Sequence, residues 1–320
     1  MHSLRRRGRT RANAWWLRRA QIGVTTLLAL FVLVVGGALP ASAKPPQGLI
    51  VFTSDRGAQS DLWTMRPDGS NQVRLTNDKV EDVFPTWSPD GKKIAWTRGG
   101  TFDPGAELWI MNADGTGKRQ ITFNSFADAG ASFSPDGTRL AFRSVRNGNI
   151  DVYVVNVDGT GEQRLTDDPA PDRIADWSPD GTKISFTSDR SGVCAIYTMS
   201  PDGSNVQKLT PDWMRAGVAA WSPDGSRLIF SDNFCATTEA DLFVVNADGS
   251  GITQVTDSAE NELSKSWSPS ADKVVADFAI LTGNSLHKGD IAVITVADGA
   301  TTNLTNTTGI NEEHPEWSPH

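Results

Sequence analysis

Three observations predict an all-β fold: a six-bladed β-propeller of four-stranded blades, with the ring closed by the C-terminal strand entering the first blade. An aromatic residue followed by Ser-Pro recurs at intervals of 46, 44, 44, 46 and 50 residues. A threonine ends a short segment in the same phase, and the chain starts and stops in mid-repeat. Four strands in about 40–50 residues are typical of a propeller blade. The anchors are Trp87, Phe133, Trp177, Trp221, Trp267 and Trp317, and the threonines are Thr76, Thr122, Thr166, Thr210, Thr256 and Thr305.

Each repeat predicts its four strands in a fixed order. The aromatic-Ser-Pro segment is the first strand, and the Pro-Asp-Gly that follows it in four repeats supplies a turn, because Pro presets φ and Gly accepts a positive φ. An alternating strand comes second, as in residues 138–144, where Leu140 and Phe142 share one face. A third strand, such as residues 150–156, leads through an Asp-Gly turn to a brief fourth strand.

The two ends of the chain supply complementary parts of one blade. Residues 48–56 match the second strand of a repeat, so the first repeat lacks its first strand. Residues 314–320, HPEWSPH, match a first strand with nothing after it. We therefore expect the last strand to enter the first blade as its innermost strand. Such closure removes the exposed edges that an open sheet presents to other chains.

Residues 1–43 have the pattern of a secretory signal peptide. Arginines precede an apolar run over residues 22–39, and Ala41-Ser42-Ala43 follows as a small-residue cleavage site. An uncleaved membrane anchor is the alternative, because the apolar run is nearly long enough to span a bilayer. We expect cleavage and export to a periplasm, to the cell surface or to the medium, which leaves residues 44–320 as the propeller.

The charge of the mature chain limits its partners. Residues 1–43 hold seven of the 30 basic residues and none of the 38 acidic ones, so their removal leaves a formal net charge of −15. Nucleic acid and anionic lipid need a basic face, and neither is expected as a partner. We expect a monomer that has no membrane contact after cleavage and binds a protein or peptide with a basic segment.

The repeat resembles that of the TolB-type β-propeller family, whose WD40-like or PD40 repeats are written around W-S-P-D-G and a later D-G and L-T. The motif recurs in phase over nearly all of the mature chain, as at Trp177–Gly181 and Leu165-Thr166. The resemblance implies an exported platform that binds proteins. TolB itself has an α/β domain ahead of the propeller, and we expect none here.

The loops that join one blade to the next are longer and less regular than the turns, as functional loops tend to be. They contain fourteen acidic residues against four basic ones. A carboxylate stands five positions before the anchor in five of the six blades, and we predict that this ring at the channel mouth binds a cation or a basic segment. The alternative is that each carboxylate accepts hydrogen bonds at the start of its strand. The five are Asp82, Asp128, Asp172, Glu262 and Glu312.

The fifth blade breaks this pattern, because its residue at that position is Ala216. Trp213, Met214 and Arg215 stand just before it, either as a protein-contact spot or as residues that pack inward. Elsewhere on the same face, Cys194 and Cys235 fall in loops of consecutive blades. A disulfide between them is predicted for an exported protein, with two free thiols as the alternative.

The sequence offers little for an enzyme, and we expect a non-catalytic protein-binding platform. It contains no G-x-S-x-G elbow, no Walker loop and no G-x-G-x-x-G. The alternative is a metal-dependent lyase or lactonase at the channel mouth, which would require a divalent cation as cofactor. Its candidate ligands beside the carboxylate ring are His314, Glu313 and His287, with solvated loop residues as the other interpretation.

Overall fold

The computed structural model describes residues 48–320 except 58, 101–102, 147, 234–239, 259, 283–284 and 287–288, and in the strands of the sixth blade it leaves out the side chains of 264–265, 279–282 and 285–286. The leader, Cys235 and His287 therefore lie outside the described residues. Every helix or strand assigned within them is a β-strand. None of the described residues forms a helix long and apolar enough to cross a membrane.

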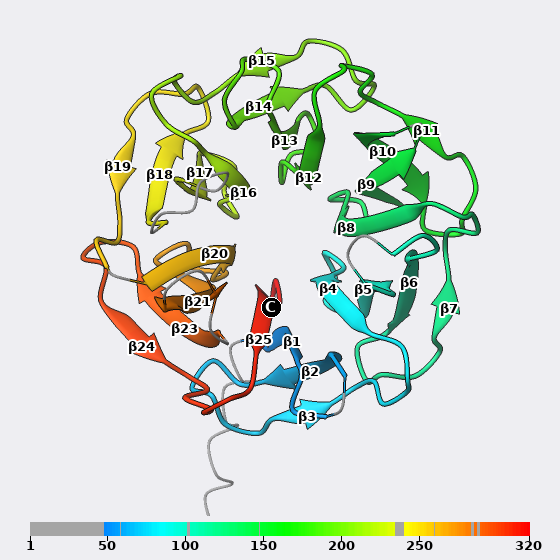
Figure 1. The fold of residues 1–320 in the computed structure, drawn as a ribbon, viewed down its shortest axis with the longest axis vertical. Helices are drawn as coiled ribbons and strands as arrows, with labels where there is room; N and C mark the ends of the chain where they lie inside the picture. Colours follow the sequence, from blue (N-terminus) through cyan, green and yellow to red (C-terminus); the bar gives the residue numbers. More distant parts are fainter. Residues whose placement is uncertain are drawn as a thin grey trace, which may run out of the picture. The chain divides into compact units, whose positions relative to one another are not determined.

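Six antiparallel sheets stand around a central axis, and each runs from an innermost to an outermost strand (Figure 1). We number them as blades 1 to 6. Blade 1 contains β25 (Glu312–Trp317), β1 (Ile50–Ser54), β2 (Asp61–Met65) and β3 (Val73–Arg74), and blade 2 contains β4 (Asp82–Trp87), β5 (Lys93–Arg98), β6 (Glu107–Asn112) and β7 (Arg119–Gln120). Blade 3 contains β8 (Ala127–Phe133), β9 (Arg139–Arg146), β10 (Asn149–Asn156) and β11 (Gln163–Arg164), and blade 4 contains β12 (Asp172–Trp177), β13 (Ile184–Ser188), β14 (Ala195–Met199) and β15 (Gln207–Lys208).

The last two blades complete the ring. Blade 5 contains β16 (Gly217–Trp221), β17 (Arg227–Ser231), β18 (Leu242–Asn246) and β19 (Thr253–Gln254). Blade 6 contains β20 (Glu260–Trp267), β21 (Lys273–Thr282), β23 (Asp290–Thr295) and β24 (Thr301–Asn303), with β22 (Ser285–Leu286) paired to β21. The predicted fold, blade number and strand order are confirmed.

The C-terminal strand closes the ring as the half-repeats predict. β25 pairs with β1 in antiparallel register, so that Trp317 stands opposite Ile50. Beyond the strand, the backbone N–H of Leu49 donates to Ser318 Oγ at 2.8 Å, and the N–H of Ser318 donates to the carbonyl of Leu49 at 2.7 Å. The strand thus satisfies backbone groups that would otherwise form an exposed edge inside the channel.

The hydrophobic core lies between neighbouring blades rather than in the centre of the ring. One cluster joins Ala141 and Val152 of blade 3 to Trp177, Phe186 and Tyr197 of blade 4. Each anchoring tryptophan is at least nine-tenths buried in such a cluster. The anchors recur in the sequence because each inter-blade interface needs one large apolar side chain at the same place.

Every innermost strand carries a β-bulge three residues before its anchor. The register against the second strand shifts there in all six blades. The bulged residue has a positive φ in the five blades for which that angle is described: Phe84 at 51°, Gly130 at 66°, Ile174 at 50°, Val218 at 52° and His314 at 53°. Positive φ is costly for bulky and β-branched residues, by about 1–3 kcal/mol each. The bulge turns the side chain of this residue toward the channel, and the packing of the surrounding blades offsets the strain.

Candidate functional site

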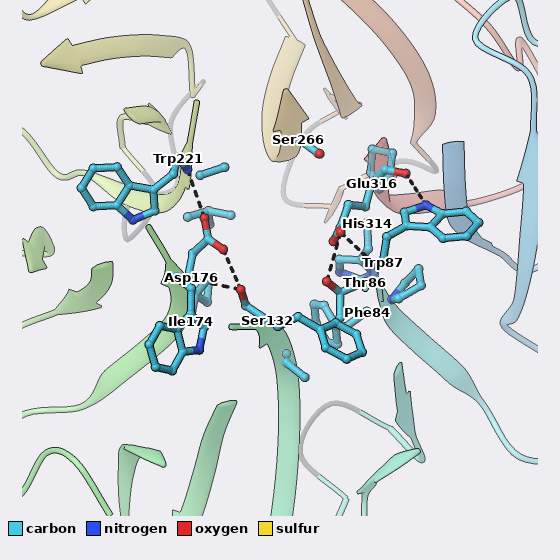
Figure 2. Close-up of a pocket in the computed structure, with 18 of the residues that line it drawn as sticks. Phe84, Thr86, Trp87, Ser132, Ile174, Asp176, Trp221, Ser266, His314 and Glu316 are labelled. Atoms are coloured by element: carbon cyan, nitrogen blue, oxygen red, sulfur yellow. Dashed lines mark hydrogen bonds between the residues drawn. The ribbon is translucent and has the colours of Figure 1, made fainter. Parts of the chain in front are cut away.

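A cavity of about 600 Å³ occupies the central channel, and the innermost strands supply most of its walls. This volume is in the range of small-molecule sites in proteins. Figure 2 shows side chains of the bulges and of the residues just before the anchors facing one another around it. The channel therefore contains a cavity that is lined by side chains and is large enough to hold a small ligand.

The bulged residues form one layer of the cavity wall. Phe84, Ile174, Val218 and His314 all line it. The rings of Phe84 and His314 lie 3.8 Å apart between centroids and are tilted by 45°. Burial, with a further contribution from the Arg143 charge, lowers the pKa of His314 to about 3. His314 is consequently neutral at physiological pH, and its ring and that of Phe84 present aromatic surface to the channel.

The residue just before the anchor forms a second layer, and Asp176 is its member in blade 4. Ser132 Oγ of blade 3 donates to Asp176 Oδ1 at 2.7 Å, and the backbone N–H of Trp221 in blade 5 donates to Oδ2 at 3.0 Å. One carboxyl group thereby links three blades. Burial raises the pKa of Asp176, and these hydrogen bonds oppose the rise.

Glu316 makes the corresponding link on the other side of the ring. Its Oε1 accepts from the backbone N–H of Trp87 at 2.8 Å and from Thr86 Oγ1 at 3.0 Å, which ties blade 1 to blade 2. Burial raises the pKa of Glu316 to about 8, and the charge of Asp176 adds to the rise. Blades 1 and 4 stand opposite each other, so the two carboxyl groups occupy opposite walls (Figures 1 and 2).

The five carboxylates predicted to ring the channel mouth are placed differently from expectation. Each lies within the first three residues of its innermost strand, but each is buried, with an exposed fraction of 3% or less. An arginine at the end of the second strand or two residues beyond it pairs with four of them: Arg98 with Asp82, Arg146 with Asp128, Arg190 with Asp172 and Arg56 with Glu312. Glu262 instead accepts hydrogen bonds from Ser258 and Thr256. The four arginine-paired carboxylates link the first two strands of their own blades, Glu262 is bonded to the segment that leads into its strand, and all five are buried rather than open to solvent.

The pairing arginines also stack on aromatic rings of the third strand. Arg146 lies 4.3 Å from the ring centroid of Tyr153, and Arg190 lies 5.1 Å from that of Tyr197. Arg56 and Arg98 make the same contact with tryptophans. The sequence carries a signal for this arrangement in three blades, since Arg56, Arg146 and Arg190 recur in phase, each 20 residues before the threonine of its repeat. Arg98 stands outside this phase, directly opposite Asp82 in the register. Blade 5 lacks both members of the pair.

The inter-blade loops present large apolar side chains to solvent. Trp213 is 75% exposed, whereas its neighbour Met214 is buried in the core beside blade 5 and Arg215 is exposed. The two interpretations of this segment therefore apply to different residues. Phe123 and Phe126, which the sequence analysis did not single out, are 76% and 38% exposed in the loop between blades 2 and 3.

The predicted metal ligands are not gathered into a cluster in the described part of the chain. His314 faces Phe84 in the channel, Glu313 stands beside it in β25, and His287 lies outside the described residues. No group of three or more His, Cys, Asp or Glu side chains among the described residues is arranged to hold a metal ion. Cys194 is disulfide-bonded, and Cys235 lies outside the described residues.

Comparison with known proteins identifies the family to which the sequence is similar. The model of the TolB beta propeller domain, PD40, matches residues 49–233. The Tol-Pal system protein TolB of Anaeromyxobacter dehalogenans is 46% identical over 44 residues, which are 14% of this chain and 10% of that protein. The match thus spans about a tenth of the length of this curated relative.

Solved structures share the fold at low sequence identity. TolB from Acinetobacter baumannii superposes with a TM-score of 0.73 at 24% identity, over 85% of this chain and 67% of that one. An oligogalacturonate lyase from Vibrio parahaemolyticus has a TM-score of 0.56 at 14% identity, over 81% of this chain and 74% of that one. At these identities the likeness concerns the fold alone.

Proposed function

Because the chain belongs to the TolB beta propeller domain family, we propose that it is an exported, non-catalytic propeller that binds a partner protein through the loops between its blades. Support for export comes from the leader pattern of residues 1–43. Support for protein binding comes from the family, whose relatives include a protein of the Tol-Pal system. The observation that carries the proposal is the exposed aromatic surface of the inter-blade loops.

All inter-blade loops lie on one face of the ring. Each blade has four antiparallel strands, so the outermost strand ends on the face where the innermost strand begins. We call this side the loop face. It contains four of the six exposed large hydrophobic residues in the described part of the chain: Val80, Phe123, Phe126 and Trp213. Aromatic residues are enriched in protein interfaces, and tryptophan is frequent among the residues that dominate binding energy.

The charge around these residues favours a partner with a basic segment. Among the described residues, the inter-blade loops expose five carboxylates and two basic side chains. A local excess of negative charge steers a basic partner toward the face and discriminates against acidic ones. The carboxylates are Asp78, Glu81, Asp167, Asp212 and Asp257, and the basic residues are Lys79 and Arg215.

An affinity capture from the envelope fraction of the source organism tests the proposal. The bait is the mature chain, compared with a Phe123→Ser/Trp213→Ser variant. The matched control is Val73→Ser/Val206→Ser, which changes two exposed apolar residues near the outer strands. We expect one set of proteins to be retained by wild type and control and lost with the loop variant. Retention of the same proteins by all three baits would contradict the proposal.

A further inference from the structure

The residue just before the anchor makes related links on opposite sides of the ring, and the link in blades 3 to 5 is complete. Ser132 Oγ donates to Asp176 Oδ1 at 2.7 Å, and the backbone N–H of Trp221 donates to Asp176 Oδ2 at 3.0 Å. The serine oxygen also accepts the backbone N–H of Trp177 at 3.3 Å. The serine hydroxyl and both carboxyl oxygens therefore have partners within the channel wall.

The matching link between blades 6 and 1 is open at its serine. Ser266 stands just before its anchor as Ser132 does, and its Oγ accepts the backbone N–H of Trp317 at 3.2 Å. Among the residues that the structure describes, none accepts the hydroxyl hydrogen of Ser266, whereas Asp176 accepts that of Ser132. Ser266 lines the cavity. Its hydroxyl group is therefore a donor available to a ligand.

Glu316 is open at the same place. It corresponds to Asp176 but is one methylene longer, and its Oε1 alone accepts both donors from blade 2, which are the N–H of Trp87 and the hydroxyl of Thr86. No group in the described part of the chain is hydrogen-bonded to Oε2. The raised pKa of Glu316 keeps it protonated at neutral pH, and the proton resides on Oε2 because Oε1 already accepts two hydrogen bonds. Glu316 and Ser266 thus present two donors to the cavity from neighbouring strands (Figure 2).

The wall across from these donors is apolar and has a recess. Blade 3 stands opposite blade 6 (Figure 1), and its bulge is Gly130, where blades 2 and 4 have Phe84 and Ile174. A Cβ added at Gly130 would meet no atom within 4 Å. Ala131 and Ala175 continue this wall, and all five residues line the cavity. The recess over Gly130 has room for the apolar body of a ligand.

The charged groups of the cavity wall do not favour a charged ligand in this recess. Arg143 and Asp277 have opposite charges, and each interacts with other groups of the protein. Asp176 is bonded to two blades, and the low pKa of His314 keeps it neutral. Glu313 lines the cavity nearer the loop face, because β25 begins on that face. A charge of either sign in the recess would be buried against apolar side chains, which is unfavourable.

We propose that the channel binds an uncharged molecule that has an apolar body and a carbonyl group at one end. The carbonyl oxygen has two lone pairs and accepts hydrogen bonds from Ser266 and Glu316, and the body lies in the recess over Gly130. The cavity of about 600 Å³ suits such a molecule, because small-molecule sites combine mostly apolar walls with a few placed polar groups. The complete link at Ser132 and Asp176 uses its donors within the wall, so the ligand binds in one orientation.

Calorimetric titration with three compounds of similar shape tests the site. N-benzylpyrrolidinone is uncharged and has a lactam carbonyl, N-benzylpyrrole is uncharged and has no carbonyl, and N-benzylpyrrolidine is a cation at neutral pH. The variants are Ser266→Ala, its matched control Ser132→Ala, and Glu316→Gln. A fourth variant, Gly130→Ile, gives blade 3 the residue that blade 4 has at its bulge. A thermal unfolding scan verifies that each variant is folded.

We expect wild type to bind the lactam at least about tenfold more tightly than either of the other compounds. Ser266→Ala should weaken lactam binding by about tenfold, and Ser132→Ala should leave it unchanged. Glu316→Gln should retain the lactam, because the amide N–H₂ group still donates at the position of Oε2. Gly130→Ile should weaken lactam binding, because the new side chain fills the recess.

Three results would overturn the proposal. The first is no saturable binding of the lactam at millimolar concentration, and the second is equal or tighter binding of N-benzylpyrrole or N-benzylpyrrolidine by wild type. Tighter binding of the cation would point to the Glu313 carboxylate instead. The third is an equal effect of Ser266→Ala and Ser132→Ala in folded proteins. The first two results need no variant, and the loop face is unchanged throughout, so the outcome is independent of partner capture.

Discussion

Replacing Glu316 with glutamine should change how the stability of the propeller depends on pH. The carboxyl group lies in the channel wall and joins blades 1 and 2 through the N–H of Trp87 and the hydroxyl of Thr86. Its pKa is about 8 in the folded protein against an ordinary value of 4.5. Folding therefore favours the protonated form. The stabilisation is fully present below pH 4.5 and is lost as the pH rises through 8.

The size of the effect follows from the pKa difference. A shift from 4.5 to about 8 corresponds to a loss of about 5 kcal/mol at pH 9, at 1.36 kcal/mol per unit. Glu316 is only partly buried, so solvent screens part of its charge, and we expect about 2–3 kcal/mol in a measurement. Glutamine is neutral at every pH and keeps an oxygen that accepts from Trp87 and Thr86. Glu316→Gln should thus match wild type at pH 4 and exceed it by about 2–3 kcal/mol at pH 9.

Urea unfolding followed by tryptophan fluorescence measures this difference at pH 4, 6, 7.5 and 9. Glu316→Ala is the control, because it removes the acceptor together with the charge. It should be less stable than wild type at pH 4 by about 1–3 kcal/mol, since a buried N–H loses its partner. A constant difference between Glu316→Gln and wild type across this range would refute the reasoning.

Three further predictions concern stability. Ile174→Gly should stay within about 1 kcal/mol of wild type, because relief of a positive φ offsets the lost side chain, whereas Ile184→Ala in the core should cost about 2–5 kcal/mol; urea unfolding compares them. Trp317→Ala should cost about 3–5 kcal/mol, because it removes the large buried side chain of the closing strand, and a loss below about 1 kcal/mol by the same method would contradict this. Cys194→Ser should lower the melting temperature of the oxidised protein and leave that of the reduced protein unchanged, as calorimetry with and without dithiothreitol would detect.

The blades and the closure of the ring could be predicted because each depends on residues that recur in sequence. An anchor such as Trp177 fills the same inter-blade space in every repeat, and Trp317 without a following hairpin marks the missing first strand. The Pro-Asp-Gly and Asp-Gly turns fixed the strand order for the same reason. Repetition converts one local pattern into the whole architecture.

The channel could not be predicted in the same way. A β-bulge shifts the alternation of side chains, so simple period-two reading does not indicate that Phe84 or His314 faces the cavity. The five carboxylates near the starts of the innermost strands were expected at an accessible surface. Their burial was missed because their partners come from another part of the blade, as Arg190 does for Asp172. The in-phase recurrence of Arg56, Arg146 and Arg190 was the sequence signal that would have indicated buried pairs.

The proposal that the loop face binds a partner protein is tested most directly by one equilibrium measurement. The partner recovered by capture is titrated against wild type, the Phe123→Ser/Trp213→Ser variant and the Val73→Ser/Val206→Ser control. We predict that the loop variant binds at least about tenfold more weakly, since exposed aromatic residues are the typical centres of an interface. The control should bind as wild type does. Equal affinity of all three proteins would contradict the assignment of the loop face.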